Sequence, residues 1–128
     1  MTAEKIKTNL QMKGKTMKIA HVTIHSAKKD ETVRFYQEYC GLKVQRELGD
    51  MITFLADGEG QTAVEVIDDA QKAAQTSGLS IGFAVDDVEA YREKLAAAGL
   101  EPTEIISPNP HVKFFFVKDP NGIDIQFI

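Results

Sequence analysis

The sequence has little of what marks several common protein classes. Its single cysteine, Cys40, cannot form a disulfide within the chain, which indicates a reducing, cytoplasmic location. No N-terminal apolar stretch resembles a signal peptide or a membrane span. With 15 Lys and Arg against 19 Asp and Glu, the net charge is -4, and no basic stripe is interleaved with aromatic residues. We therefore expect neither a nucleic-acid nor a membrane partner.

The sequence does contain enough apolar residues for one compact domain. It has 128 residues, of which 43% are hydrophobic. The first sixteen, MTAEKIKTNLQMKGKT, are mostly polar with isolated apolar positions and no sustained period. We therefore predict a flexible tail at 1–16 and a single domain over 17–128.

The first half of the predicted domain reads as a strand, a helix and three strands. MKIAHVTIH alternates in the manner of a strand, and DETVRFYQEYCGLKV has helical periodicity, with Asp30 as the expected N-cap and Gly41 as the stop. Strands are then predicted around VQREL, MITFLAD and TAVEVI, separated by turn signals.

The second half repeats this order. LSIGFAV predicts a strand, and DDVEAYREKLAAAGL predicts a helix capped by Asp86 or Asp87 and stopped by Gly99. The strands TEIIS, VKFFFVKD and IDIQFI follow. A four-stranded sheet with one helix buries only one of its faces, so two such modules are expected to share a core. The prediction is an α+β fold of two tandem βαβββ modules, at about 17–68 and 78–128.

Two stretches, HVTIHSAKKDETVRFYQEYCGLKV and FFFVKDPNGIDIQFI, resemble the vicinal oxygen chelate (VOC) superfamily. This superfamily contains glyoxalase I, the extradiol dioxygenases and the bleomycin-resistance proteins. The first stretch is similar to its opening strand and Phe-Tyr helix, with Cys40 replacing a usual leucine, and the second to its closing Asp-Pro-Asn-Gly turn and strand. The resemblance covers roughly 17–128. It implies a curved mixed sheet with helices on the convex face, a ligand cleft inside, and a homodimer whose subunits help to wall each other's clefts.

The resemblance also implies four metal-ligand positions, on the first and last strands of each module. His21 and Glu65 fill the positions of module one with good ligands for a divalent cation. Ser80 and Gln126 fill those of module two, where glyoxalase-like enzymes carry histidine or glutamate. One imidazole and one carboxylate beside a neutral hydroxyl and amide predict only weak binding of zinc, nickel, manganese or iron. Gln126 also cannot accept a proton at neutral pH, which removes a candidate base.

Strand alternation predicts which side chains line the cleft. Small residues, Gly82 and Ala84, follow Ser80 on the same face. His25 shares the face of His21 but lies about 13 Å along the strand, at roughly 3.3 Å per residue, so these two cannot hold one ion. The Phe-Phe-Phe run at 114–116 must place at least one ring in the cleft. The candidate ligand-binding residues are His21, Thr23, His25, Glu65, Ser80, Phe115 and Gln126.

Two classes of function stay open. One is a small-molecule-binding protein of the bleomycin-resistance type, and the other is a glyoxalase-like lyase or isomerase with an atypical metal site. Dioxygenase chemistry is disfavoured because the second half supplies neither a histidine nor a carboxylate at its two metal-ligand positions. The acidic net charge suits a cationic ligand, although the chain lacks tryptophan, the best aromatic for cation stacking. His21 and Glu65 could also simply hydrogen-bond each other.

Overall fold

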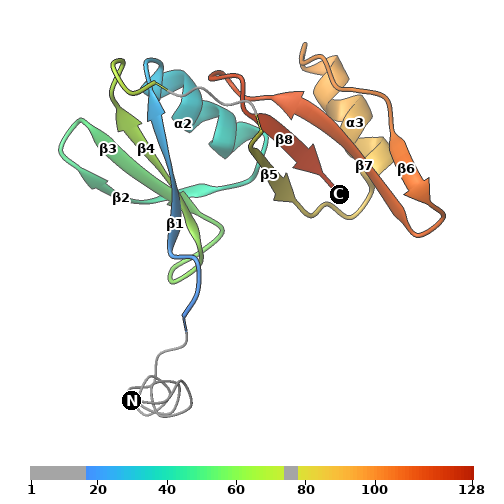
Figure 1. Cartoon of the computed structure of the whole chain (residues 1–128), viewed down its shortest axis with the longest axis horizontal. Coiled ribbons are helices and arrows are strands. Elements are labelled where there is room, and N and C mark those ends of the chain that lie inside the picture. Colours follow the sequence, from blue (N-terminus) through green and yellow to red (C-terminus); the bar gives the residue numbers. More distant parts are fainter. Residues whose placement is uncertain (1–16, 74–77) are drawn as a thin grey trace.

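The structure is a computed structural model that describes residues 17–73 and 78–128, so the predicted tail at 1–16 lies outside the described residues. The first module contains one helix and a four-stranded sheet of order β1-β4-β3-β2 (Figure 1). Strand β1 is parallel to β4, and the other pairs are antiparallel. Its elements are β1 (His21–Ser26), α2 (Lys29–Glu38), β2 (Lys43–Leu48), β3 (Ile52–Ala56) and β4 (Ala63–Asp68).

The second module repeats this arrangement, with sheet order β5-β8-β7-β6 and β5 parallel to β8. The predicted βαβββ repeat is thus confirmed, and both sheets are mixed. The elements are β5 (Ser80–Phe83), α3 (Val88–Ala97), β6 (Ile106–Asn109), β7 (Val112–Lys118) and β8 (Asp124–Phe127).

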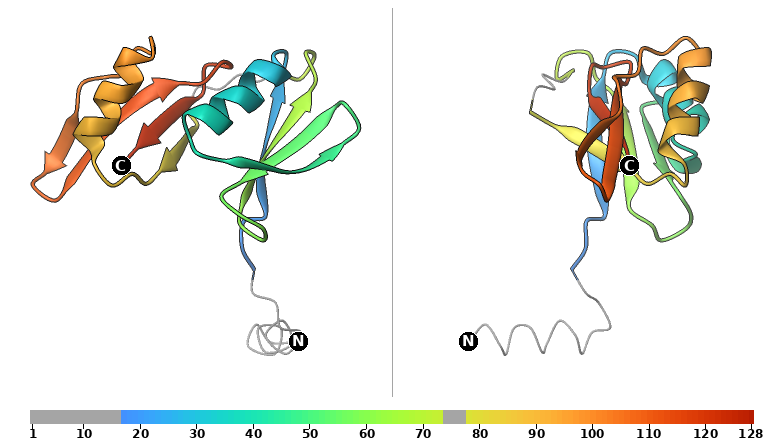
Figure 2. Two further views of the ribbon diagram at one scale, coloured as in Figure 1. Left: turned by 180° about the vertical axis from the view of Figure 1, so that it is seen from behind. Right: turned by 90° about the vertical axis from the view of Figure 1, so that its right-hand side faces the viewer.

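Both helices lie on the same side of the two sheets, as the right-hand view of Figure 2 shows. The strand residues that face the helices are buried, because alternate side chains of a strand point to opposite faces. Val64 and Val66 of β4 are 6% and 0% exposed, and Ile125 and Phe127 of β8 are 0% and 1% exposed. The residues between them, among them Glu65, lie on the opposite, more exposed face.

Three local expectations need correction or refinement. Asp30 is not the N-cap of α2: the cap is Lys28, without a side-chain cap bond, and Asp30 lies in the first turn, where its charge favours the helix dipole. In α3 the cap is Asp87, which accepts from the Ala90 N–H at 3.0 Å. Strand β6 begins later than expected and runs through Pro108 to Asn109. An edge strand tolerates this proline because its outer N–H position needs no partner.

A partly buried polar network joins the two modules. The Asn121 side chain accepts from the Ser26 hydroxyl at 2.6 Å and donates to the Thr32 hydroxyl at 3.0 Å. The Tyr36 hydroxyl donates to Asp119 at 2.9 Å. Ser26 ends β1 and Asn121 lies just before β8, so the network ties together the two strands that carry His21 and Gln126.

Candidate functional site

Four side chains form a row across the exposed face of the first sheet. Thr23, Glu65, Phe54 and Arg46 are cross-strand neighbours on β1, β4, β3 and β2. The Thr23 hydroxyl donates to Glu65 Oε1 at 2.6 Å, and the Glu65 side chain is only 12% exposed. The threonine therefore orients a largely buried carboxylate, which keeps its second oxygen for another partner.

His21 stands diagonally beside this row. Its Nε2 lies 3.5 Å from Glu65 Oε1, and its ring makes an edge contact with Phe54 at a centroid separation of 5.9 Å. The His21 side chain is 47% exposed, so its imidazole can meet a ligand from solvent. The structure thus brings together His21 and Glu65, the two predicted metal-ligand residues of module one. It adds Phe54, which contacts the His21 ring.

A hollow of about 640 Å³ opens beside His21. Its apolar part comes from Phe54, Ala56 and Ala63, and its polar rim includes Arg46. The Arg46 guanidinium carbon lies 4.4 Å from the centroid of the Phe54 ring, a cation–π geometry. The remaining lining comes from Ala20, Gln45, Gly58, Glu59, Gly60 and Gln61.

His25 shares the sheet face but has a different partner. Its Nδ1 lies 3.2 Å from Asp69 Oδ2, in the loop after β4. The hydrogen bond from His25 contributes to lowering the pKa of Asp69, after the larger effect of the bond from the Lys72 N–H. The structure therefore places His25 at the rim, paired with a carboxylate and separate from the contacts of His21 and Glu65.

The second sheet presents an equivalent face with different chemistry. Gly82, Gln126 and Phe116 are cross-strand neighbours, as are Ser80 and Asp124. A Cβ at Gly82 would lie 3.1 Å from Gln126 Oε1, so the absent side chain leaves room for that amide. Asp124, next to Ser80, is paired with Lys118 at 2.7 Å.

Phe115 does not line this face. It is 0% exposed and stacks on Phe127 in the core, with ring centroids 5.3 Å apart. The prediction of Phe115 in the cleft is therefore wrong, because the β7–β8 register places Phe116 and not Phe115 opposite Gln126. Phe114 and Phe116 lie on the exposed face, and their ring centroids are 5.7 Å apart.

The described residues of one chain do not by themselves make a metal site. Within 17–73 and 78–128, no three His, Cys, Asp or Glu side chains are grouped so as to hold an ion. His21 and Glu65 are adjacent, whereas Ser80 and Gln126 belong to the other sheet, which lies beside the first and does not face it (Figure 1). One imidazole and one carboxylate leave most of a cation's coordination to water.

A buried tyrosine, Tyr36, and a half-buried cysteine, Cys40, lie near the module junction. Burial, and after it the negative charge of Asp119, raises the pKa of the Tyr36 hydroxyl and of the Cys40 thiol far above their ordinary values. Both groups are therefore neutral at physiological pH. Cys40 lacks the thiolate that nucleophilic chemistry requires.

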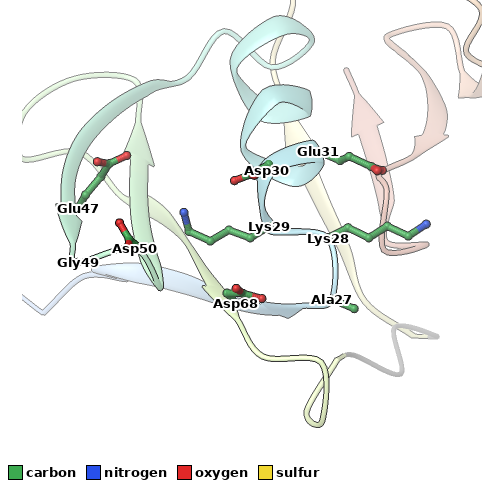
Figure 3. A pocket seen from close by; sticks show the side chains of 9 residues that line it. All are labelled: Ala27, Lys28, Lys29, Asp30, Glu31, Glu47, Gly49, Asp50 and Asp68. Atoms are coloured by element: carbon green, nitrogen blue, oxygen red, sulfur yellow. The ribbon is translucent and has the colours of Figure 1, made fainter.

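A second hollow, of about 610 Å³, lies at the start of α2 (Figure 3). Its lining includes five acidic side chains and two lysines. Lys29 extends toward Glu47 and Asp50, while Lys28 points away. This hollow has no aromatic side chain, and it includes none of the predicted ligand-binding residues. Its lining is Ala27, Lys28, Lys29, Asp30, Glu31, Glu47, Gly49, Asp50 and Asp68.

Comparison with known proteins identifies the class that this fold and these marker positions define. The model of the Glyoxalase/Bleomycin resistance protein/Dioxygenase superfamily matches residues 18–127. The chain belongs to this superfamily, and the predicted resemblance is confirmed. No helix in the described part of the chain is long and apolar enough to cross a lipid bilayer.

Individual relatives include both enzymes and binding proteins. The lactoylglutathione lyase of Haemophilus influenzae is 28% identical over 126 residues, covering 88% of this chain and 92% of that protein. A glyoxalase family protein from Enterococcus faecalis superposes with a TM-score of 0.71 at 26% identity, over 86% of this chain and 95% of that chain. An antibiotic-binding protein from a Streptomyces species shares the fold, with a TM-score of 0.70 at 17% identity over 88% and 94% of the two chains.

Sequence reasoning missed three residues of the two faces: Arg46, Phe54 and Phe116. Phe54 and Phe116 occupy equivalent places, opposite Glu65 and Gln126 respectively. Pairing the closing strand of each module with its predecessor would have found both. Arg46 would still have been missed, since its position depends on an irregularity in β2.

Proposed function

We propose that the chain binds a small organic ligand on the sheet faces that carry Glu65 and Gln126, with a metal site that is incomplete by the family's pattern. The observation that supports this most is the His21–Glu65–Phe54 group beside the hollow. It offers an oriented carboxylate, an accessible imidazole and an apolar floor, which are the elements of a small-molecule site. The equivalent face of module two offers the neutral groups of Ser80 and Gln126.

A homodimer is part of this proposal. In one chain the two sheets lie side by side (Figure 1), so the His21 face is left open by its own second module. A second copy would cover it and could bring its Ser80 and Gln126 opposite His21 and Glu65. Sedimentation at micromolar concentration tests this, and a monomer would count against it. We also propose a cytoplasmic location, in keeping with one unpaired, half-buried cysteine.

The alternative is a metal-dependent lyase or isomerase. The 3.5 Å approach of His21 to Glu65 favours it, because this pair could supply the first two ligands of a cation. The presence of a lactoylglutathione lyase among the relatives favours it as well. Gln126 argues against it, since an amide supplies neither a charged ligand nor a base.

Two measurements on the full chain separate the two functions. Metal analysis of protein purified without chelator, before and after addition of zinc, nickel or manganese, should find well under one ion per chain. A thermal-shift screen of small organic molecules, including antibiotics, should find ligands that raise the melting temperature without metal. Stoichiometric metal together with lactoylglutathione lyase activity would favour the enzyme.

A further inference from the structure

We propose that Arg46 is an anion-binding group of the ligand site, so that the natural ligand carries a carboxylate or a similar acidic group. This inference rests on the proposed function and specifies its ligand class. It departs from the cationic ligand that the net charge of the chain suggests. The local arrangement of β2 and β3 is a better guide than the total charge, because a bound molecule interacts most strongly with the groups that contact it.

An irregularity in β2 places Arg46 on the site face. Residues two apart in a regular strand share a face. Val44 pairs with Leu55, which is buried on the helix side, whereas Arg46 pairs with Phe54, which faces the hollow. The extra residue between them, Gln45, has no register partner, which is the geometry of a β-bulge. Bulges often redirect a side chain next to a functional site, and this one adds a positive charge to the row of Thr23, Glu65 and Phe54.

The guanidinium has the capacity to bind an anion. Arg46 is exposed, and its only specific contact to a described side chain is the cation–π contact with Phe54, with the guanidinium carbon 4.4 Å from the ring centroid. Arg92, by contrast, donates to the Thr103 carbonyl and lies 3.5 Å and 3.3 Å from two glutamates. The contact with Phe54 restrains the Arg46 group, and a planar guanidinium with five donors suits the two oxygens of a carboxylate.

Neither Glu59, which lines the same hollow, nor Glu65 neutralises this charge through a direct contact. Glu65 is already bonded to Thr23 at 2.6 Å and approached by His21 at 3.5 Å. In the described residues no carboxylate lies within ion-pair distance of Arg46. A ligand could therefore place an apolar body over Phe54, Ala56 and Ala63, its acidic group on Arg46 and a polar group near His21.

The alternative role for Arg46 is purely structural: its side chain would shield the Phe54 ring from water. Phe54 is 8% exposed, and an arginine stem or guanidinium commonly covers such a surface. This reading predicts that the charge of a bound molecule is unimportant. The two readings are separated by probes of one shape and different charge.

The experiment is an NMR titration of the ¹⁵N-labelled full chain with benzoate, benzamide and benzylammonium, which share a ring and differ in charge. Benzoate should shift the amide signals of Arg46, Phe54 and Ala63 in a saturable manner. It should bind at least about tenfold tighter than benzamide, equivalent to about 1.4 kcal/mol. Benzylammonium should bind no better than benzamide.

Variants then assign the preference to Arg46. Arg46→Gln should abolish the difference between benzoate and benzamide, and Arg46→Lys should retain part of it. The matched control is Arg34→Gln, which removes an exposed arginine of α2 and should leave all three affinities unchanged. Circular dichroism melting checks that each variant is folded, and the conservative lysine variant provides a second test if the glutamine variant is not.

Equal binding of benzoate and benzamide at the hollow, or tightest binding of benzylammonium, would overturn the anion inference and leave small-molecule binding intact. An unchanged benzoate preference in Arg46→Gln would overturn it as well. If no probe gives a saturable shift, the inference fails. The proposed function fails only if the independent ligand screen also finds nothing.

Discussion

The Tyr36 hydroxyl donates to the Asp119 carboxylate at 2.9 Å, across the junction between the two modules. Asp119 is 5% exposed and also accepts from the backbone N–H groups of Asn121 and Ile123 at 2.7 and 2.9 Å. The Asp-Pro-Asn-Gly turn thus has two roles in this chain. It closes the β7–β8 hairpin, and it fixes module two to helix α2.

Tyr36→Phe should destabilise the protein, because it leaves a buried carboxylate with one fewer donor. A hydrogen bond to a charged group contributes about 1.5–3 kcal/mol, and we expect a loss in this range in the free energy of unfolding by denaturant. Tyr39→Phe is the matched control: it lies in the same region, and its hydroxyl has no hydrogen bond to a described residue. Its effect should stay within about 0.5 kcal/mol. Equal losses in both variants would show that the Asp119 bond does not matter.

Alkaline pH should weaken the fold through Cys40 and Tyr36. Burial raises the pKa of the Cys40 thiol above its ordinary value of 9.0, and that of Tyr36 above 10.0. The folded state therefore keeps protons that the unfolded state loses. Stability is unaffected below about pH 8.5 and falls as pH rises past the unfolded-state values, by up to about 1.4 kcal/mol per pH unit for each group. Cys40→Ala should remove the part of this decline that begins near pH 9, as measured by denaturation between pH 7 and 10. An unchanged pH profile in the variant would contradict the assignment.

Thr53→Val should stabilise the protein. Thr53 is 0% exposed, and its hydroxyl is the buried side-chain polar atom of the described residues that has no hydrogen-bond partner. Replacing it with a methyl group of similar shape removes an unpaired buried group, which is worth about 1–3 kcal/mol, and thermal melting measures the gain. The same change at Thr32 should have the opposite sign, since its hydroxyl bonds the Lys28 carbonyl at 2.8 Å and Asn121 at 3.0 Å. A lower melting temperature for Thr53→Val would contradict the prediction.

The sequence was informative for most features that a local pattern determines, although the N-cap of α2 is Lys28 and not the expected Asp30. Alternation in the closing strands correctly separated Glu65 and Gln126 from the core residues beside them, and Gly41 and Gly99 do follow the helices in the left-handed region. It failed where a feature depends on pairing between strands. Three consecutive phenylalanines carry no alternation of their own, so Phe115 was assigned to the wrong face.

Features that depend on an irregularity or on a distant loop were beyond the sequence. The bulge that directs Arg46 toward the hollow has no signature in KVQREL, and the partner of His25 is a loop residue 44 positions away. The residues at the four metal-ligand positions could be listed from the family resemblance. That two of them lie on an open face of each sheet could be found only from the three-dimensional structure.

Ser80 and Gln126, and not the fold, should limit metal binding. Ser80→His with Gln126→Glu supplies two imidazoles and two carboxylates, counting His21 and Glu65, at positions on exposed sheet faces where no core packing is lost. Gly82 leaves space beside residue 126 for the new carboxylate.

We expect the wild type to bind zinc or nickel weakly, and the double mutant to bind at least about a hundredfold tighter, equivalent to about 2.7 kcal/mol. Because the four positions lie on two sheets that do not face each other within one chain, this gain should appear only in the proposed homodimer. Titration calorimetry above and below the dimer dissociation concentration measures it, and His21→Ala in the double mutant should abolish it. Equally tight binding by both proteins would show that His21 and Glu65 suffice with ligands from elsewhere, and the lyase or isomerase function would then be the better proposal.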